Sequence, residues 1–316
     1  MPQGRLCTGP LGEDVQREGR AQQPGPISTR AVRSFFDSLL KAAGLQRCGT
    51  GPGQQVARLA LESQRAGNDV VVVVSAMSGE TNRLLALAHQ VVALPDAREL
   101  DVIAATGEQV SVALTAMAIQ ARGGKACSLL GHQLPLRTDS TFTRARIQRV
   151  ELDALREALA RGQIAVVAGF QGVDADDNIT TLGRGGSDTT AVALAAALGA
   201  DACEIYTDVD GIYTADPRSC PSGRKLKTIP YEEMLELASL GAKVLQVRSV
   251  EIAMKYNVPV HVRSSFSEQV EGSWIVSRER AFEARPLMGL ACERGLARVE
   301  LLGMESRPEL AAELTG

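Results

Sequence analysis

Aromatic and histidine side chains are scarce in this sequence, which has 3% aromatic residues and three histidines among its 316 residues. The six cysteines are scattered and form no Cys-x-x-Cys pair, so neither a zinc site nor a disulfide framework is expected. A formal net charge of −3 gives no cationic surface for nucleic acid or for an anionic membrane. These absences favour small-molecule chemistry with no metal held by the protein itself.

Long hydrophobic runs are also missing, because the longest apolar stretches are strand-sized or alanine-rich with polar residues between them. No apolar stretch follows a basic start as in a secretory signal. We therefore expect a cytoplasmic protein with no membrane partner. The 45% of hydrophobic residues can form a sizeable core, and the abundance of Ala, Val, Leu and Gly favours helices packed on a parallel sheet.

The N-terminal part of the chain has no regular pattern. Residues 1 to about 30 are rich in Gly, Pro, Gln and Arg, so little apolar burial offsets the entropy of ordering them. Over 29–45 the apolar residues follow a helical spacing, and a glycine-rich stretch at 49–53 then breaks the chain. We predict an atypical, largely disordered segment over residues 1–53, with a helix at 29–45.

Strand and helix patterns alternate between residues 54 and 280. The clearest strand is the valine run from Asp69 to Val74, which is typical of a strand buried on both faces. The alternation predicts an α/β fold, a three-layer αβα sandwich with a mostly parallel central sheet. Further strands are predicted at 126–130, 163–169, 202–206 and 258–262, and helices at 54–66, after Gly79, and at 100–122, 151–161, 188–198, 230–239 and 243–256. Residues 281–316 hold one strand-like run and the start of a helix, which cannot form a core by themselves.

A glycine loop, Thr181-Leu-Gly-Arg-Gly-Gly-Ser-Asp-Thr-Thr190, leads directly into an alanine-rich helix. Glycines let backbone N–H groups approach a ligand closely, and a helix start adds a positive dipole end, so the loop suits phosphate or carboxylate. Arg184 adds a planar fork for either anion. The alternative is an ordinary capped turn, with Asp188 as the N-cap and Arg184 in solvent. The loop by itself leaves both open.

Two more loops follow predicted strands. Thr207 and Asp208 come after the strand at 202–206, at the edge where open α/β sheets bind ligands, although the Asp-Gly and Asp-Pro pairs that follow also suit a plain polar turn. Ser75 begins a small-residue loop between the valine strand and the next helix. That loop lacks the lysine of a Walker motif, so alone it favours an ordinary strand-to-helix connection.

Two charged residues occupy unusual helical positions. Glu108 lies in a helix of small and apolar residues, where a buried carboxylate would need a partner such as an ammonium group, although the side chain could also face water. Lys243 lies at the start of a predicted helix, where the dipole disfavours a cation unless an anion is near. A bound phosphate or simple solvation would each account for this lysine.

Five segments, in this order and spacing, resemble the amino acid kinase family, and within it the bacterial aspartokinases. The resemblance covers residues 56–267. The segments are Val71-Val-Val-Val-Ser-Ala-Met-Ser-Gly-Glu-Thr-Asn82, Thr106-Gly-Glu108, Thr181-Leu-Gly-Arg-Gly-Gly-Ser-Asp188, Thr207-Asp-Val-Asp-Gly-Ile-Tyr-Thr-Ala-Asp-Pro-Arg218 and Gly241-Ala-Lys243.

The resemblance implies ATP-dependent phosphorylation of the β-carboxylate of L-aspartate, the first step of lysine, threonine and methionine biosynthesis. Thr81, Glu108, Arg184 and Ser187 would hold aspartate, with Glu108 on the α-amino group and Arg184 on the α-carboxylate. The nucleotide would contact Ser75, Thr207, Asp208, Tyr213, Arg218 and Lys243. Asp188 and Lys243 would be catalytic, Asp188 orienting cationic groups and Lys243 reaching the phosphates.

The chemistry fits these residue types. An aspartate carboxylate with a pKa of about 3.9 is already ionised near neutral pH, so the reaction needs no general base. Catalysis then depends on positioning of the reactants and on charge neutralisation. A lysine, helix N-termini and a magnesium ion carried on ATP would neutralise the charge. The expected partners are therefore aspartate, ATP and, in a homo-oligomer, further copies of the chain.

The two ends depart from the family pattern. The family's first strand carries Lys-Phe-Gly-Gly-Thr-Ser or a near variant, whereas the corresponding stretch here reads Lys41-Ala-Ala-Gly-Leu-Gln-Arg-Cys-Gly-Thr50, with no recognisable first strand. Residues 281–316 resemble a linker and only the start of a regulatory ACT module. The alternatives are a catalytically impaired relative that serves as a ligand-binding or assembly subunit, and a kinase for another amino acid carboxylate.

Overall fold

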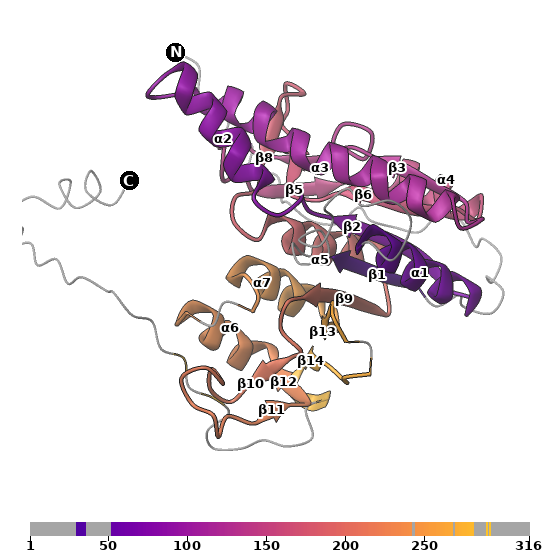
Figure 1. Ribbon diagram of the computed structural model, residues 1–316, viewed down its shortest axis with the longest axis vertical. Coiled ribbons are helices and arrows are strands. Elements are labelled where there is room, and N and C mark those ends of the chain that lie inside the picture. The colour runs from indigo at the N-terminus through magenta and orange to yellow at the C-terminus, as the bar shows by residue number, and fades with distance from the viewer. Residues whose placement is uncertain are drawn as a thin grey trace, which may run out of the picture.

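The computed structural model describes residues 30–35, 52–241, 244–267, 269–280, 289 and 291. Within them the largest sheet has eight strands in the order β12-β14-β13-β9-β1-β2-β6-β3 (Figure 1). All of its pairs are parallel except β13 with β14. The strands are β1 (Arg30–Phe35), β2 (Asp69–Val74), β3 (Ala126–Leu129), β6 (Ile164–Ala168), β9 (Ala202–Thr207), β12 (Thr228–Pro230), β13 (Val260–Ser264) and β14 (Ser273–Val276).

Helices cover both faces of this sheet, and the valine run of β2 shows why. Successive strand residues point to opposite faces. Val70, Val72 and Val74 accordingly pack with α1 (Pro52–Arg65) and α3 (Ala97–Gln120), whereas Val71 and Val73 pack on the other side. The helices on that other side are α4 (Asp153–Ala160), α5 (Gly186–Leu198), α6 (Tyr231–Ser239) and α7 (Val247–Tyr256). The predicted three-layer αβα sandwich is confirmed.

A second, four-stranded sheet has the order β5-β4-β7-β8 and leads into α5. Its strands are β4 (Leu136–Thr138), β5 (Ile147–Val150), β7 (Gln171–Val173) and β8 (Ile179–Thr181). A small antiparallel pair, β10 (Ile212–Tyr213) with β11 (Lys225–Leu226), follows β9. The sequence did not predict these strands or β12 and β14, because runs of two to four residues are too short for an apolar period to be recognised.

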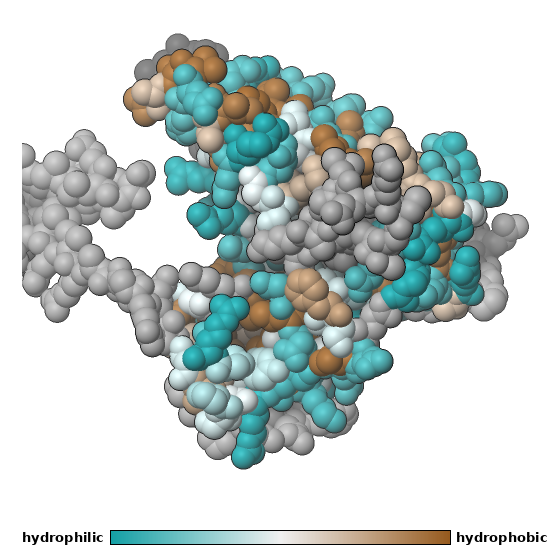
Figure 2. Space-filling model, in the orientation of Figure 1, coloured by the Kyte–Doolittle hydropathy of each residue, from teal (hydrophilic) through white to brown (hydrophobic). Residues whose placement is uncertain are grey.

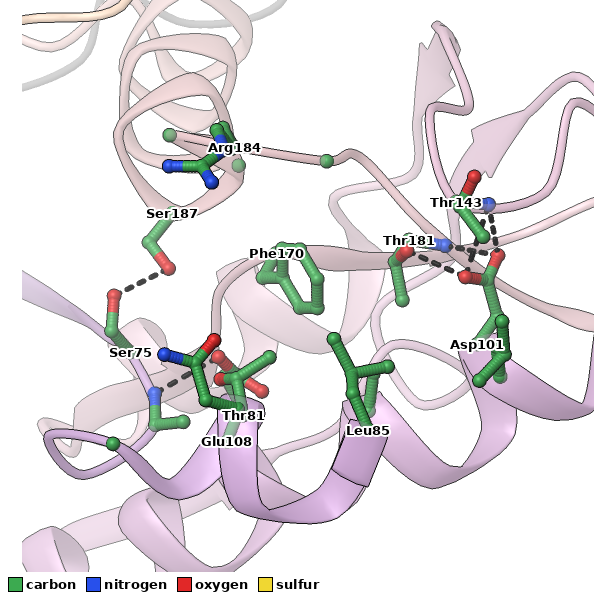
Figure 3. A pocket seen from close by; sticks show the side chains of 18 of the residues that line it. Ser75, Thr81, Leu85, Asp101, Glu108, Thr143, Phe170, Thr181, Arg184 and Ser187 are labelled. Carbon is green, nitrogen blue, oxygen red and sulfur yellow. Dashed lines mark hydrogen bonds between the residues drawn. The ribbon is translucent and has the colours of Figure 1, made fainter. Parts of the chain in front are cut away.

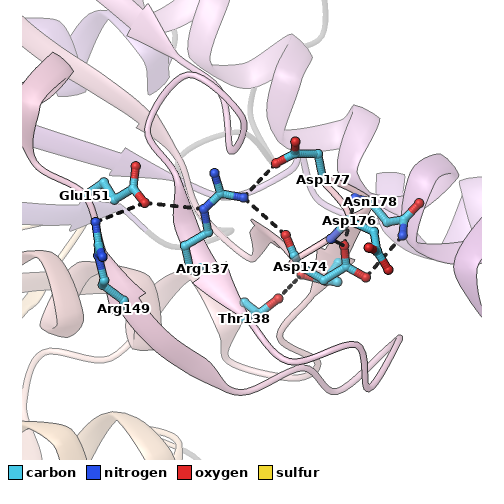
Figure 4. A network of polar contacts seen from close by, with 9 residues as sticks. Arg137, Thr138, Arg149, Glu151, Asp174, Asp176, Asp177 and Asn178 are labelled. Carbon is cyan, nitrogen blue, oxygen red and sulfur yellow. Dashed lines mark hydrogen bonds and ion pairs between the residues drawn. The ribbon is translucent and has the colours of Figure 1, made fainter.

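Arg137 on β4 holds the second sheet together through a polar network (Figure 4). Its guanidinium lies 3.4 Å from Glu151 and 2.7 Å from Asp177, and it donates to the carbonyl oxygen of Asp174 at 3.2 Å. The network connects β4 with the β7–β8 turn. Because these groups are partly exposed, each ion pair contributes little energy, and the value of the network is mainly to fix the turn geometry.

The N-terminal prediction needs correction. Residues 30–35, predicted as part of a helix, form strand β1, which pairs in parallel with β2 and with β9. The first strand of the fold is therefore present, contrary to the sequence-based expectation. Because β1 lies between two strands, its backbone groups form hydrogen bonds on both sides. The stabilisation from this pairing exceeds the preference for a helix that the spacing of the apolar residues indicates. The other residues of 1–51, and nearly all of 281–316, lie outside the described residues.

The helices predicted downstream are confirmed, with one shift. Helix α2 (Glu80–Val91) follows Gly79 as predicted and packs on α3. Helix α7 begins at Val247 rather than at residue 243.

Large apolar side chains are exposed at the end of α2 and just after it, at Leu87, Val91, Val92 and Leu94. Figure 2 shows them as a brown patch at the upper left. By length and composition α3 is the one helix among the described residues that could cross a membrane, but half of its most apolar stretch is buried inside the protein. A core helix passes the same test.

Candidate active site

A pocket of about 550 Å³ opens at the carboxyl ends of β2 and β6 (Figure 3). Its walls come from the loop after β2, from α2 and α3, from the β4–β5 loop and from the glycine loop between β8 and α5. Open α/β sheets bind ligands at this edge, where the strands end and loops diverge. The pocket therefore lies where the fold class places a binding site.

Five of the predicted site residues line this one pocket: Ser75, Thr81, Glu108, Arg184 and Ser187. They come from the loop after β2, from α2, from α3 and from the glycine loop with the first turn of α5. The four residues predicted to hold the amino acid substrate are all among them. The two serines meet directly, because the Ser75 hydroxyl donates to Ser187 Oγ at 2.6 Å.

The glycine loop has a backbone that only small residues allow. Gly183 and Gly185 have φ angles of 76° and 67°, in the left-handed region. A Cβ atom on Gly185 would lie 1.7 Å from Cγ of Gln246, so the close approach of α7 also requires glycine there. Helix α5 begins at Gly186 with no side-chain cap, and its first residues line the pocket. The positive end of its dipole is therefore available to an anion in the pocket.

Glu108 is the buried acid of the pocket, with 3% of its surface exposed. Its Oε1 accepts a hydrogen bond from the Ala76 N–H at 2.9 Å, whereas Oε2 has no partner among the described residues. Burial raises the pKa of Glu108 to about 7. The interpretation in which Glu108 faces water is wrong. An unpaired, buried carboxylate oxygen at a pocket wall instead favours a cationic ligand group.

Gly185 occupies the N-cap position of α5, so Asp188, which lies buried in the first turn of that helix, is not its N-cap. Burial raises the pKa of Asp188 to about 7, and its Oδ1 has no hydrogen-bond partner among the described residues. It does not line the pocket; its charge acts on Cys203 of β9. An ionised carboxylate in these surroundings is stable only beside a cation.

Of the predicted nucleotide residues that the structure describes, only Ser75 lines the pocket. Thr207 ends β9, and its hydroxyl donates to Asp208 Oδ1 at 3.2 Å. The Tyr213 hydroxyl donates to Asp210 Oδ1 at 3.0 Å. Arg218 is exposed, and its backbone N–H donates to Asp216 in a turn, as the plain-turn interpretation predicts for that stretch. Lys243 lies outside the described residues.

Sequence reasoning missed several residues that line the pocket, among them Asp101, Thr143 and Phe170. Asp101 precedes Glu108 by seven residues on α3, a spacing that places both on one helix face and could have indicated it. Phe170 has a φ angle of 68°, which is rare for a residue with a side chain, and nothing in the sequence signals it. Its backbone N–H donates to Thr190 Oγ1 at 3.2 Å, which fixes it beside α5.

The two buried carboxyls predict how stability depends on pH. The folded-state pKa values of Glu108 and Asp188, about 7, lie above the ordinary values of 4.5 and 3.8, so folding retains protons that the unfolded chain releases. Their contribution is complete below those ordinary values and is lost as the pH rises through about 7. We expect these two groups to lower the free energy of unfolding of the ligand-free protein by about 2 to 5 kcal/mol between about pH 5 and pH 9. The buried ring of His261, whose pKa burial lowers to about 4, acts in the opposite direction below about pH 6.5.

Urea unfolding at several pH values measures this fall. A double variant Glu108→Gln, Asp188→Asn whose stability changes with pH as that of the unaltered protein does would contradict the contribution of both carboxyls. Glu108→Gln and Asp188→Asn should each remove part of the pH dependence.

The sequence of the chain is similar to that of known proteins. Residues 48–264 match the amino acid kinase family. The chain is 53% identical over 265 residues to an aspartokinase of Pseudomonas aeruginosa, covering 83% of this chain and 64% of that protein. It is 52% identical over 266 residues to an aspartokinase of Mycolicibacterium smegmatis, covering 83% and 62%. The chain thus spans slightly less than two thirds of the curated relatives that it matches.

Solved structures show the same likeness. The crystal structure of aspartate kinase from Synechocystis superposes with a TM-score of 0.68 at 43% sequence identity, covering 83% of this chain and 42% of that one. The structure of E. coli aspartokinase III in complex with aspartate and ADP gives a TM-score of 0.67 at 27% identity, covering 79% and 64%.

Proposed function

The chain belongs to the amino acid kinase family, and from that membership we propose that it phosphorylates the β-carboxylate of L-aspartate with ATP. The observation that carries the proposal is the pocket in which Thr81, Glu108, Arg184 and Ser187 meet, with one oxygen of the buried Glu108 unpaired. The relatives named aspartokinase support it, as does the similar E. coli enzyme solved with aspartate and ADP.

The charges in the pocket suit an α-amino acid. Glu108 lies deep on α3, and Arg184 lies opposite on the glycine loop (Figure 3). We assign the α-amino group of aspartate to Glu108 and its α-carboxylate to Arg184, with the hydroxyls of Thr81 and Ser187 as further hydrogen-bond partners. An ammonium group at Glu108 would favour the ionised carboxylate, so binding of aspartate should release a proton near neutral pH.

Phosphoryl transfer to the β-carboxylate needs positioning and charge neutralisation rather than a base. We assign the N-terminus of α5 to the negative charge that develops on the transferring group. We assign Ser75, Thr207, Asp208, Tyr213, Arg218 and Lys243 to the nucleotide, and Asp188 to the cations that accompany the phosphates. Among the described residues no three His, Cys, Asp or Glu side chains gather as a metal site, and Mg²⁺ would come bound to ATP, whose charge it neutralises.

The second candidate is a relative that binds ligands without turnover. The observation that favours it is that neither the first strand, Arg30-Ala-Val-Arg-Ser-Phe35, nor the stretch Lys41 to Thr50 carries the phosphate-binding Lys-Phe-Gly-Gly-Thr-Ser of the family. Losing one cation from a phosphoryl-transfer site lowers the rate by roughly a hundred- to a thousandfold. Thermal stabilisation by aspartate or ATP with no product would favour this candidate.

Trapping the acyl phosphate with hydroxylamine tests the proposal. ATP, magnesium and L-aspartate should give aspartyl hydroxamate, and glutamate and N-acetylglutamate should give none. A folded protein that yields no hydroxamate with aspartate would refute the activity, and a preference for another substrate would reassign it. The proposed enzyme is cytoplasmic and self-associating, and light scattering after gel filtration measures the association.

Arg184→Lys tests the proposed carboxylate fork. Lysine keeps the positive charge but loses the planar pair of donors, so we expect the KM for aspartate to rise about 5- to 50-fold with little change in the KM for ATP. Arg161→Lys, at the C-cap of α4 in an exposed ion pair with Glu157, is the matched control and should change neither constant. An unchanged KM for aspartate in Arg184→Lys would remove Arg184 from the substrate site.

A further inference from the structure

Asp101 receives more hydrogen bonds than a surface acid would need. It is on α3 and 1% exposed. Its carboxylate accepts the backbone N–H of Thr181 at 2.8 Å and the Thr181 hydroxyl at 2.6 Å. It also accepts the backbone N–H of Thr143 at 2.9 Å, with both oxygens within 3.0 Å of that nitrogen (Figure 3). One buried anion therefore fastens α3 to two segments that line the pocket, the start of the glycine loop and the β4–β5 loop.

Arg248, on α7, binds the carbonyl groups of the same two segments. Its guanidinium donates to the carbonyl oxygen of Leu182 at 2.7 Å and to that of Ala145 at 2.9 Å. The segments also bond each other, because the Ala145 N–H donates to the Thr181 carbonyl oxygen at 2.8 Å. Asp101 thus accepts N–H groups, and Arg248 donates to C=O groups, of the same two paired segments.

The strained backbone here needs such support. Thr143 has a φ angle of 68°, in the left-handed region that a β-branched residue rarely adopts. Gly183, two residues after Thr181, also has a positive φ. Strained residues persist only where surrounding contacts determine their conformation. The bonds to Asp101 and Arg248 are contacts of this kind, because all of them except that of the Thr181 hydroxyl hold the main chain.

We propose that Asp101 and Arg248 are positioning residues that clamp the start of the glycine loop and so fix the spacing between Glu108 and Arg184. Asp101 and Glu108 are seven residues apart on one rigid helix, a rise of about 10 Å. Thr181 and Arg184 are three residues apart in the loop. The bonds between Asp101 and Thr181 therefore set where Arg184 lies relative to Glu108. The expected effect of the clamp on activity rests on the proposed aspartate site.

Asp101→Asn is the main variant. Asparagine has nearly the same shape, but its amide nitrogen cannot accept, so at least one of the three donors loses its partner. We expect the KM for aspartate to rise at least tenfold, whereas the KM for ATP changes less than threefold. Arg248→Met should show the same split. Glu99→Gln, an exposed position on the same helix, is the matched control and should leave both constants unchanged.

A series of milder variants separates a loss of positioning from a folding defect. Thr181→Val removes one donor and keeps the backbone N–H bond, so it should raise the KM for aspartate two- to fivefold, and Thr181→Ser should restore it. Thermal unfolding identifies variants that are folded. If folded Asp101→Asn keeps the wild-type KM for aspartate, or if both KM values rise equally, the positioning role is refuted.

Hydrogen exchange separates the clamp from the enzyme activity. The amides of Thr143 and Thr181 should exchange at least tenfold faster in Asp101→Asn than in the unaltered protein, with helix α5 unaffected. Equal exchange in the two proteins would overturn the clamp. If the exchange behaves as expected but the unaltered protein forms no aspartyl hydroxamate, the proposed function fails while the clamp stands.

Discussion

Glu108→Gln is expected to lower kcat/KM for aspartate by about 150- to 4,000-fold, chiefly through KM. Removing one partner of a buried charge pair costs about 3 to 5 kcal/mol, because the other charge remains without compensation. Here the charge without compensation would be the ammonium group of the substrate. The variant should still fold, since the glutamine carbonyl can accept the Ala76 N–H that Glu108 Oε1 now accepts. Hydroxamate formation over a range of aspartate concentrations measures the effect.

Two comparisons make this result specific to the ammonium contact. Glu99→Gln makes the same chemical change at an exposed position on the same helix and should leave kinetics intact. The KM for ATP should stay within about threefold in Glu108→Gln. A loss of less than tenfold in kcat/KM for aspartate would show that Glu108 does not pair with the substrate.

Asp188→Asn is expected to lower kcat by about 10² to 10³-fold and yet to stabilise the ligand-free protein at alkaline pH. The kinetic loss follows because a group that organises charge at the transferring phosphoryl contributes about 3 to 4 kcal/mol in such sites. The gain in stability follows because the asparagine carries no charge into the buried surroundings that raise the pKa of Asp188 to about 7. We expect the free energy of unfolding to rise by about 1 to 3 kcal/mol at about pH 9.

Asp153→Asn provides the matched control, because Asp153 is exposed in the first turn of α4 as Asp188 is buried in the first turn of α5. Losing an exposed acid there should cost a few tenths of a kcal/mol through the helix dipole. Urea unfolding of both variants at pH 6 and at pH 9 gives the comparison. Asp188→Asn would contradict the prediction if it lost stability at both pH values or kept full kcat.

Much of the fold could be predicted because local sequence patterns match its main elements. The valine run of β2 and the alternating helices led to the αβα sandwich, and the downstream helices are confirmed. Strand β1 could not be predicted, because its residues have a helical spacing and their strand conformation comes from pairing with β2 and β9. The short strands of the second sheet were missed for the related reason that their pairing is non-local.

The candidate site, like the fold, could be predicted only in part from the sequence. Residues with an unusual local setting could be named from the sequence: Arg184 and Ser187 in a glycine loop, and Glu108 in an apolar helix. The sequence left open whether Glu108 faces water and whether Asp188 is a helix cap. Both are buried and lack a partner for one oxygen among the described residues, and this depends on what packs over them from distant segments.

The sequence by itself determined which chemical groups are available and the order of the longer strands and helices from α1 onward, because side-chain identity and apolar period are local properties. Only the tertiary structure decided that the four residues proposed to hold the substrate, which come from three separate segments, meet in one pocket. It also decided the burial that raises the pKa of Glu108 and of Asp188 to about 7. The clamp of Asp101 and Arg248 joins residues as far as 103 positions apart. Dielectric surroundings and long-range hydrogen bonds arise from packing, so no local pattern in the chain encodes them.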